Sequence, residues 1–284
     1  MKKETMSNNF KQEVASGERF EFGKNWSKFL KLLNEEKIKI AEESLVSFLG
    51  GDLKGKSFID IGSGSGLFSL AARRLGANVF SFDYDPQSVA CTRELKERFF
   101  KDDNNWKVEQ ASALDPDYIK SLGKFDIVYS WGVLHHTGNM WLALENVDML
   151  VAENSKLFIA LYNDQGVVSK GWTIIKKIYN WLPGFLKLVY STLFIICRET
   201  ILFLICLITL RPMKYFRLWS NYNRVRGMNY YYDIIDWIGG YPFEVSKPEE
   251  IFQFYYKKGY QLTNLRTCGG KLGCNEYVFQ KKKN

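Results

Sequence analysis

The chain has 284 residues, and its 46% of hydrophobic and 16% of aromatic residues exclude a disordered protein. The formal net charge of +8 is concentrated, because ten basic residues and one acid, Glu199, lie between residues 165 and 227 and the rest of the chain is close to neutral. Five cysteines without a C-x-x-C pair disfavour a secreted disulfide framework, and a polar start without an apolar signal segment predicts a cytoplasmic protein.

A helix is expected over residues 24–49, where apolar residues recur at helical spacing until Gly50 and Gly51 end the pattern. Strands and helices then alternate, which predicts a parallel sheet flanked by helices. The expected strands are 56–61, 78–82, 106–110, 125–130 and 156–161, and the expected helices are 66–75, 86–100, 116–122 and 139–152. After an extra segment, a helix at 248–258 and a hairpin of strands 260–267 and 274–280 follow.

The most distinctive motif is the glycine loop Asp60-Ile61-Gly62-Ser63-Gly64-Ser65-Gly66, between the first strand and the next helix. Glycines let the backbone turn sharply and approach a ligand, whose polar groups can meet the N–H groups at the helix start. The second strand ends in Asp83, about 20 residues further on, where Rossmann-like units carry their ribose partner. A carboxylate at Asp60 would repel a pyrophosphate but can hold an amine. The loop therefore predicts a cofactor with an ammonium group and no phosphate, such as S-adenosylmethionine (SAM).

Together with the segment Phe125–His136, these motifs resemble the class I SAM-dependent methyltransferases over Phe58–Ala160. The run Gly76-Ala77-Asn78-Val79, followed by Phe82-Asp83, is similar to the small-molecule branch that includes the ubiquinone-biosynthesis O-methyltransferases. The resemblance implies an α/β, Rossmann-like fold with a seven-stranded, mostly parallel sheet whose last strand is antiparallel. It also implies that the extra residues are a helical insertion after the fifth strand.

The same resemblance implies SAM as the cofactor and assigns its contacts. Asp60 and the loop residues Gly62, Ser63, Gly64 and Gly66 would hold the methionine end, and Asp83 the ribose hydroxyls. Tyr84, Ser112 and Ala113 would form the adenine pocket, and Ser130 and Trp131 would complete the site. Most relatives carry an acid where Ser112 stands, and Trp131 fits either the cofactor wall or the core.

Four parts of the chain are expected: an N-terminal helical cap (1–55), a SAM-binding core (56–164), a basic and apolar helical insertion (165–247), and a C-terminal helix and hairpin (248–284). Within the insertion, residues 188–210 carry only two charges, Arg198 and Glu199. A central charge pair is costly inside a bilayer, by a few kcal/mol per charge, so a full span is disfavoured. We expect two short apolar helices that meet near residue 198, as a membrane-dipping hairpin or a lid over the active site.

His135 and His136 are the only histidines, and both follow the fourth strand, where acceptor and cofactor should meet. Methyl transfer requires mainly that the protein aligns the nucleophile and, where needed, removes its proton. A histidine can take a proton near neutral pH, so either residue is a candidate catalytic base for O-methylation. The alternative is that both only pack or hydrogen-bond.

Acceptor-binding residues are expected after the fifth strand and in the Gly-rich return of the insertion. The candidates are Tyr162, Asn163, Arg224, Arg226, Trp237 and Tyr241. Either arginine would pair with an anionic group such as a phosphate. The alternative is a structural return loop in which Asp233 and Asp236 balance the arginines. No metal-ligand spacing is present, so no metal is expected.

The sequence therefore favours a SAM-dependent methyltransferase acting on a small, apolar or lipid-linked acceptor at the membrane surface, with O-methylation preferred. Peripheral contact with an anionic membrane is expected, because the insertion is both apolar and basic. An RNA methyltransferase is the first alternative, although the chain lacks the Pro-Pro-Tyr and Pro-Cys motifs of base methylation, so a nucleic acid partner is disfavoured. A non-catalytic interaction protein is the second, against which the intact glycine loop counts.

Overall fold

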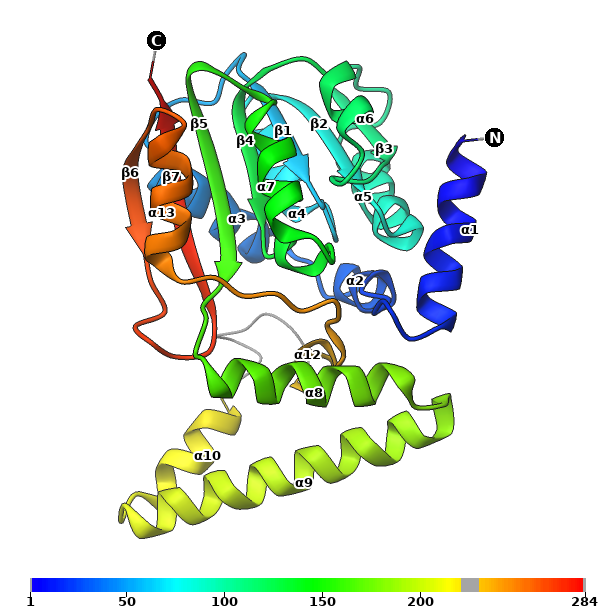
Figure 1. Cartoon of the computed structure of the whole chain (residues 1–284), viewed down its shortest axis with the longest axis vertical. Helices are drawn as coiled ribbons and strands as arrows, with labels where there is room; N and C mark the ends of the chain where they lie inside the picture. The colour runs from blue at the N-terminus through cyan, green and yellow to red at the C-terminus, as the bar shows by residue number, and fades with distance from the viewer. Residues whose placement is uncertain (1, 221–229, 283–284) are drawn as a thin grey trace.

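The computed structural model describes residues 2–220 and 230–282, and a seven-stranded sheet forms its centre (Figure 1). The strand order is β3-β2-β1-β4-β5-β7-β6, and β7 is antiparallel to both of its neighbours while the pairings among β1 to β5 are parallel. The predicted sheet with an antiparallel last strand is confirmed. The strands are β1 (Ser57–Ile61), β2 (Asn78–Asp83), β3 (Trp106–Gln110), β4 (Phe125–Trp131), β5 (Val151–Tyr162), β6 (Tyr260–Arg266) and β7 (Cys274–Lys281).

Helices cover both faces of the sheet and bury two apolar clusters against it. One face carries α3 (Glu35–Leu49), α4 (Leu67–Arg74) and α5 (Pro86–Phe99), and the other carries α6 (Pro116–Ser121), α7 (Met140–Asp148) and α13 (Pro248–Lys257). Local chemistry fixes several helix starts. Asp85 and Asp115 cap α5 and α6 by accepting from backbone N–H groups, and a proline follows each cap.

Two boundaries in the predicted core were wrong. The helix expected at 139–152 ends at Asp148, and β5 begins at Val151 instead of residue 156. At its start, β5 pairs with Phe125 through Val151, and the register then shifts before Ile127 pairs with Lys156. The early part of β5 is therefore strand because β4 offers it a partner, which the apolar pattern does not reveal.

The N-terminal region contains more helices than expected. The single helix predicted at 24–49 is two helices, α2 (Gly23–Leu30) and α3, because the Asn34 side chain accepts from the N–H of Lys37 and starts a new helix. Gly50, at a φ of 56°, ends α3 as expected. An additional helix, α1 (Lys2–Ala15), precedes both.

The insertion lies beyond the end of the sheet toward which β5 points (Figure 1). Its described helices are α8 (Val167–Trp181), α9 (Gly184–Ile208), α10 (Pro212–Ser220) and α12 (Tyr230–Gly239). The prediction of two short helices meeting near residue 198 is wrong, because α9 is continuous. The Glu199 carboxylate accepts from the side chains of Tyr215, Trp219 and Tyr230, so the central charge is satisfied without a break.

Candidate functional site

The glycine loop links β1 to α4 and requires glycine for steric reasons. Gly62 has a φ of 76°, and a Cβ on it would lie 2.2 Å from a methyl group of Val133. Gly64 has a φ of 54°, and a Cβ on it would lie 3.1 Å from the indole nitrogen of Trp26. The backbone therefore passes between two fixed neighbours with no room for a side chain.

Polar contacts hold the same loop against β2. The N–H groups of Gly62 and Ser63 both donate to the carbonyl oxygen of Phe82, and the Ser63 and Thr92 hydroxyls are 2.9 Å apart. The third loop glycine, Gly66, is the N-cap of α4 at a φ of 82°. The loop is thus preorganised before any ligand binds.

Two carboxyl groups flank the loop, that of Asp60 buried and that of Asp83 half-buried. Asp60 is 3% exposed and accepts a 2.5 Å hydrogen bond from the Ser69 hydroxyl, while Asp83 accepts from the N–H of Gly64 at 2.9 Å. Burial raises the pKa of Asp60 to about 7. Burial, together with the nearby carboxylate of Asp85, raises the pKa of Asp83 to about 7. A cation or a hydrogen-bond donor beside either carboxyl group would stabilise its ionised form.

These features fit the SAM cofactor that the sequence predicts. An ammonium group would relieve the buried charge of Asp60, and a ribose diol could donate to Asp83, whose carboxylate lies at the carboxyl end of β2. Glycine is required at positions 62 and 64 because Val133 and Trp26 lie against the loop backbone there.

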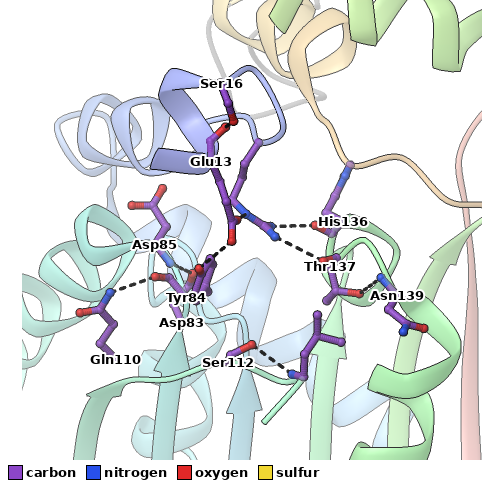
Figure 2. Close-up of polar contacts among 12 residues, drawn as sticks. Glu13, Ser16, Asp83, Tyr84, Asp85, Gln110, Ser112, His136, Thr137 and Asn139 are labelled. Atoms are coloured by element: carbon purple, nitrogen blue, oxygen red, sulfur yellow. Dashed lines mark hydrogen bonds and ion pairs between the residues drawn. The ribbon is translucent and has the colours of Figure 1, made fainter. Parts of the chain in front are cut away.

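The residues expected around adenine already have partners within the protein. The Tyr84 hydroxyl donates to Glu13 at 2.9 Å, and Phe10 contacts the same ring edge-on at 5.5 Å between centroids (Figure 2). Ser112 accepts from the N–H of Leu114 and so forms a tight turn. Ala113 is buried at the end of this turn.

Glu13 and Arg19 form a bridge across the carboxyl edge of the sheet that the sequence reasoning missed. Arg19 pairs with Glu13 and donates to the carbonyl oxygens of His136 at 3.0 Å and Thr137 at 3.3 Å (Figure 2). Glu13 in turn binds Tyr84, so the N-terminal segment connects the ends of β2 and β4. No local motif marks these residues, because the contacts span more than 70 positions of sequence.

The two histidines differ in what they can do. His135 is completely buried, its Nδ1 accepts from the N–H of Tyr162, and its Nε2 has no hydrogen-bond partner in the described part of the chain. His136 is 8% exposed and its Nδ1 lies 2.6 Å from the carbonyl oxygen of Pro242. A carbonyl only accepts, so Nδ1 of His136 carries the proton and Nε2 keeps the lone pair.

Both histidines are neutral at physiological pH. Burial, and then the positive charge of Lys176, lowers the pKa of His136 to about 3, and burial lowers the pKa of His135 well below its usual value. So low a pKa makes His136 a weak base, and the neutral ring keeps the Nε2 lone pair as a hydrogen-bond acceptor. His136 is therefore the better candidate to orient an acceptor hydroxyl, and His135 supports it from within the core.

An aromatic cluster lies next to the histidines on the acceptor side. The Tyr162 ring centroid is 4.0 Å from that of His135, 5.3 Å from that of Phe243 and 5.7 Å from that of Trp237. The structure thus brings Tyr162 and Trp237 together, although 75 positions separate them in the sequence. Phe243 was not among the predicted residues, and its place beside Tyr162 follows from the return of the chain after α12.

The other predicted residues have different surroundings. Asn163 accepts from the side chain of Asn275, and the Trp131 indole donates to Glu276, so both side chains face β7. Ser130 is buried and donates to the carbonyl oxygen of Ile61, and Tyr241 lies under Lys177. Arg224 and Arg226 lie outside the described residues.

A buried lysine, also missed from the sequence, connects α8 to α12. Lys176 is completely buried, donates to the carbonyl oxygen of Trp237, and lies 4.8 Å from the ring centroid of Phe243. Asn180, one turn later, donates to the carbonyl oxygen of Gly239 at 2.6 Å. The two side chains cap the C-terminus of α12, where a positive charge is favourable. Burial lowers the pKa of Lys176 to about 7.

Asp236 lies in the same buried region. Its carboxylate accepts from the Asn25 side chain at 2.6 Å, and burial raises its pKa to about 7. Through this bond α12 contacts α2, in which Trp26, the residue after Asn25, lies against Gly64. Contacts through α2 therefore connect α12, on the acceptor side, to the cofactor loop.

Residues 59–157 match the family model of a methyltransferase domain. The ubiquinone biosynthesis O-methyltransferase of Pelagibacter ubique is 28% identical over 133 residues, which cover 46% of this chain and 52% of that protein. The enzyme of the same name from Azorhizobium caulinodans is 25% identical over 162 residues, or 54% and 62% of the two chains. The chain thus spans about half the length of the first of these relatives and less than two thirds of the second.

Solved structures show the same fold at low identity. The magnesium protoporphyrin IX methyltransferase of Synechocystis, solved with bound S-adenosylhomocysteine (SAH), gives a TM-score of 0.51 at 15% identity over 87% of this chain and 83% of that one. A putative methyltransferase in complex with the Trm112 activator of Haloferax volcanii gives 0.53 at 11% identity, over 94% and 98% of the two chains.

Proposed function

Since this chain belongs to the class I SAM-dependent methyltransferases through residues 59–157, we propose that it transfers a methyl group from SAM to an oxygen atom of a small, apolar or lipid-linked acceptor. The observation that carries the proposal is the glycine loop between Asp60 and Asp83. Its backbone has no room for side chains at Gly62 and Gly64, and the buried carboxyl group of Asp60 and the half-buried one of Asp83 flank it.

Each group at the site has a role in this reaction. SAM supplies an electrophilic methyl group on a sulfonium, so the protein contributes mainly alignment. Asp60 and Asp83 bind the two polar ends of the cofactor. The Nε2 lone pair of His136 accepts the hydrogen bond of an acceptor hydroxyl, and Tyr162 and Trp237 provide apolar contact for the rest of the acceptor.

The residues around the proposed acceptor site support an apolar or lipid-linked acceptor. The aromatic cluster around Tyr162 suits an apolar molecule, and the curated relatives carry the name of ubiquinone biosynthesis O-methyltransferases. The insertion that contributes Trp237 is basic and apolar, which favours a protein of the cytoplasm that works in peripheral contact with an anionic membrane.

Calorimetry with SAH tests the cofactor part of the proposal. We expect wild type to bind and Asp83→Asn to bind at least about ten-fold more weakly, because a neutral amide loses the charge-assisted bonds to the ribose. Asp117→Asn makes the same change at an exposed position of α6 and should bind as wild type does. Absence of binding by wild type would favour the non-catalytic alternative.

Radiolabelled SAM then tests the acceptor. The protein is incubated with labelled SAM and either a polar lipid extract or total RNA. We expect label in the organic phase of the lipid incubation and none in the RNA. Label in the RNA fraction alone would support the RNA methyltransferase alternative and contradict the proposed acceptor class.

A further inference from the structure

The long helix α9 exposes most of its apolar side chains. It is the one helix among the described residues that is long and apolar enough to cross a membrane, yet only 11% of its most apolar window is buried. We define its outer face by six residues that recur at helical spacing and are 42–73% exposed: Phe185, Val189, Leu193, Ile196, Leu204 and Leu207. Exposed apolar surface on this scale marks an interaction site.

The inner side of α9 is already occupied. Phe194 and Ile195 pack on the cluster formed by Tyr179 of α8 and Ile234 of α12. Near the middle of the helix, Glu199 accepts from Tyr215 and Trp219 of α10 and from Tyr230 of α12. These contacts with α8, α10 and α12 fix α9 to the protein, while the six residues of the outer face remain exposed.

This arrangement is compatible with an in-plane helix and not with a span. A 25-residue helix is about 37 Å long, which would reach across a bilayer, but crossing it would bring Glu199 and its partners to the apolar centre. In Figure 1, α8 runs beside α9 on its sheet-facing side, and α10 lies obliquely against the C-terminal end of α9.

The charges around the outer face indicate what covers it. Arg211, Lys214 and Arg217 are exposed just after the C-terminal end of α9 and on α10. Glu199, the one acid of this segment, is turned inward with 13% of its side chain exposed. An exposed apolar stripe with basic residues at one end and its acid turned inward is complementary to an anionic lipid surface.

We propose that the outer face of α9 inserts in-plane into the headgroup region of an anionic bilayer. In this orientation the carboxyl edge of the sheet faces the membrane, and α9 and α8, which carries Lys176 and contacts Trp237, lie between the lipid and the acceptor site (Figure 1). The inference rests on the proposed function in one respect: membrane docking would give an apolar acceptor a route from the lipid to Tyr162.

Flotation of the full chain with vesicles tests the docking. We expect wild type to float with vesicles of equal parts phosphatidylcholine and phosphatidylglycerol, and to float less with phosphatidylcholine alone or at high salt. The variant Leu193→Asp, Ile196→Asp and Leu204→Asp should reduce the bound fraction at least about ten-fold. The matched control, Leu32→Asp, Ile40→Asp and Val46→Asp, changes exposed apolar residues beside and within α3 and should float as wild type does.

A second measurement uses the wild-type sequence, so it does not depend on how the variant folds. Cys197 lies on α9 and is the exposed cysteine, whereas Cys91 and Cys206 are buried and Cys268 and Cys274 are partly covered. An environment-sensitive dye on Cys197 should shift to the blue on addition of anionic vesicles.

The outcomes separate the docking from the methyl transfer. Wild type that fails to float, a triple α9 variant that floats as well as wild type, or an unshifted dye would overturn the docking. So would sedimentation that shows a dimer in wild type and a monomer in the α9 variant, with no flotation, because a second copy would then cover the face. Flotation without SAH binding would leave the docking intact and remove the proposed function instead.

Discussion

The Nδ1 atom of His136 donates a hydrogen bond to the carbonyl oxygen of Pro242 across 2.6 Å. This bond joins the turn after β4 to the chain that returns from the insertion, and it sets the tautomer of a ring at the acceptor side. His136 also provides a backbone carbonyl to Arg19, so one residue connects the N-terminal segment, the sheet and the insertion.

Both histidines should remain neutral through the physiological range. Nitrogen chemical shifts can be assigned readily because the chain has only His135 and His136. We expect no titration of either ring between pH 8 and about 5, because burial lowers both pKa values, to about 3 for His136. His136 should show the Nδ1–H tautomer. A ring that titrates near its usual value of about 6.5 would contradict the buried, carbonyl-bound geometry.

Cofactor affinity should rise with pH across neutrality. In the free protein the pKa values of Asp60 and Asp83 are raised to about 7, so both carboxyl groups gain protons as the pH falls below 7. Binding of an ammonium and a diol favours the ionised forms, and each proton that must leave weakens affinity by up to about ten-fold per pH unit. Calorimetry with SAH from pH 6 to pH 8 measures this slope. Asp83→Asn should reduce it, and a flat wild-type profile would refute the assignment.

The sheet and the cofactor loop could be predicted because their signals are local. Alternating apolar runs mark the strands, and three glycines after Asp60, followed by the acid Asp83 at the end of the next strand, indicate a tight turn of the cofactor-loop type. The exact ends of β5 depend on pairing with β4, which one strand cannot reveal by itself. The continuity of α9 depends on Tyr215, Trp219 and Tyr230 reaching Glu199 from other helices.

The candidate site likewise contains residues that the sequence could predict and residues that it could not. Residues of the glycine loop and the strand ends are close in sequence to the motif that identifies them. Glu13, Arg19 and Lys176 enter the site from elements distant in sequence, and nothing in their local pattern distinguishes them from surface charges. Asp236, which the sequence suggested as a partner for the arginines, is bound to Asn25 in the structure.

The N-terminal bridge should control how tightly α1 is held. Arg19→Ala removes the bonds to His136 and Thr137 and leaves Glu13 without its cation. We expect amide hydrogen exchange in α1 to accelerate by about ten-fold or more, corresponding to roughly 1.4 kcal/mol of lost local stability. Lys11→Ala, at an exposed position of α1, is the control and should leave exchange unchanged. Equal exchange in wild type and Arg19→Ala would show that the bridge does not hold the helix.

Lys176 should contribute a pH-dependent share of stability through the C-terminus of α12. Its pKa is about 7 in the folded chain and near 10.5 when unfolded, so between these values the unfolded state binds more protons and this group's contribution to the free energy of unfolding rises with pH. Below pH 7 the contribution is constant, because both states are protonated.

Lys176→Met removes that dependence and leaves the carbonyl oxygen of Trp237 without its donor. We expect a loss of about 1–3 kcal/mol of unfolding free energy at pH 8, and a difference from wild type that grows as the pH rises from 7 to 9. Lys177→Met changes the neighbouring, exposed lysine of α8 and should shift stability by less than about 0.5 kcal/mol. Urea unfolding of the three proteins at pH 7, 8 and 9 gives the comparison. If the Lys176→Met and Lys177→Met curves coincide at every pH, Lys176 does not hold α12 against α8.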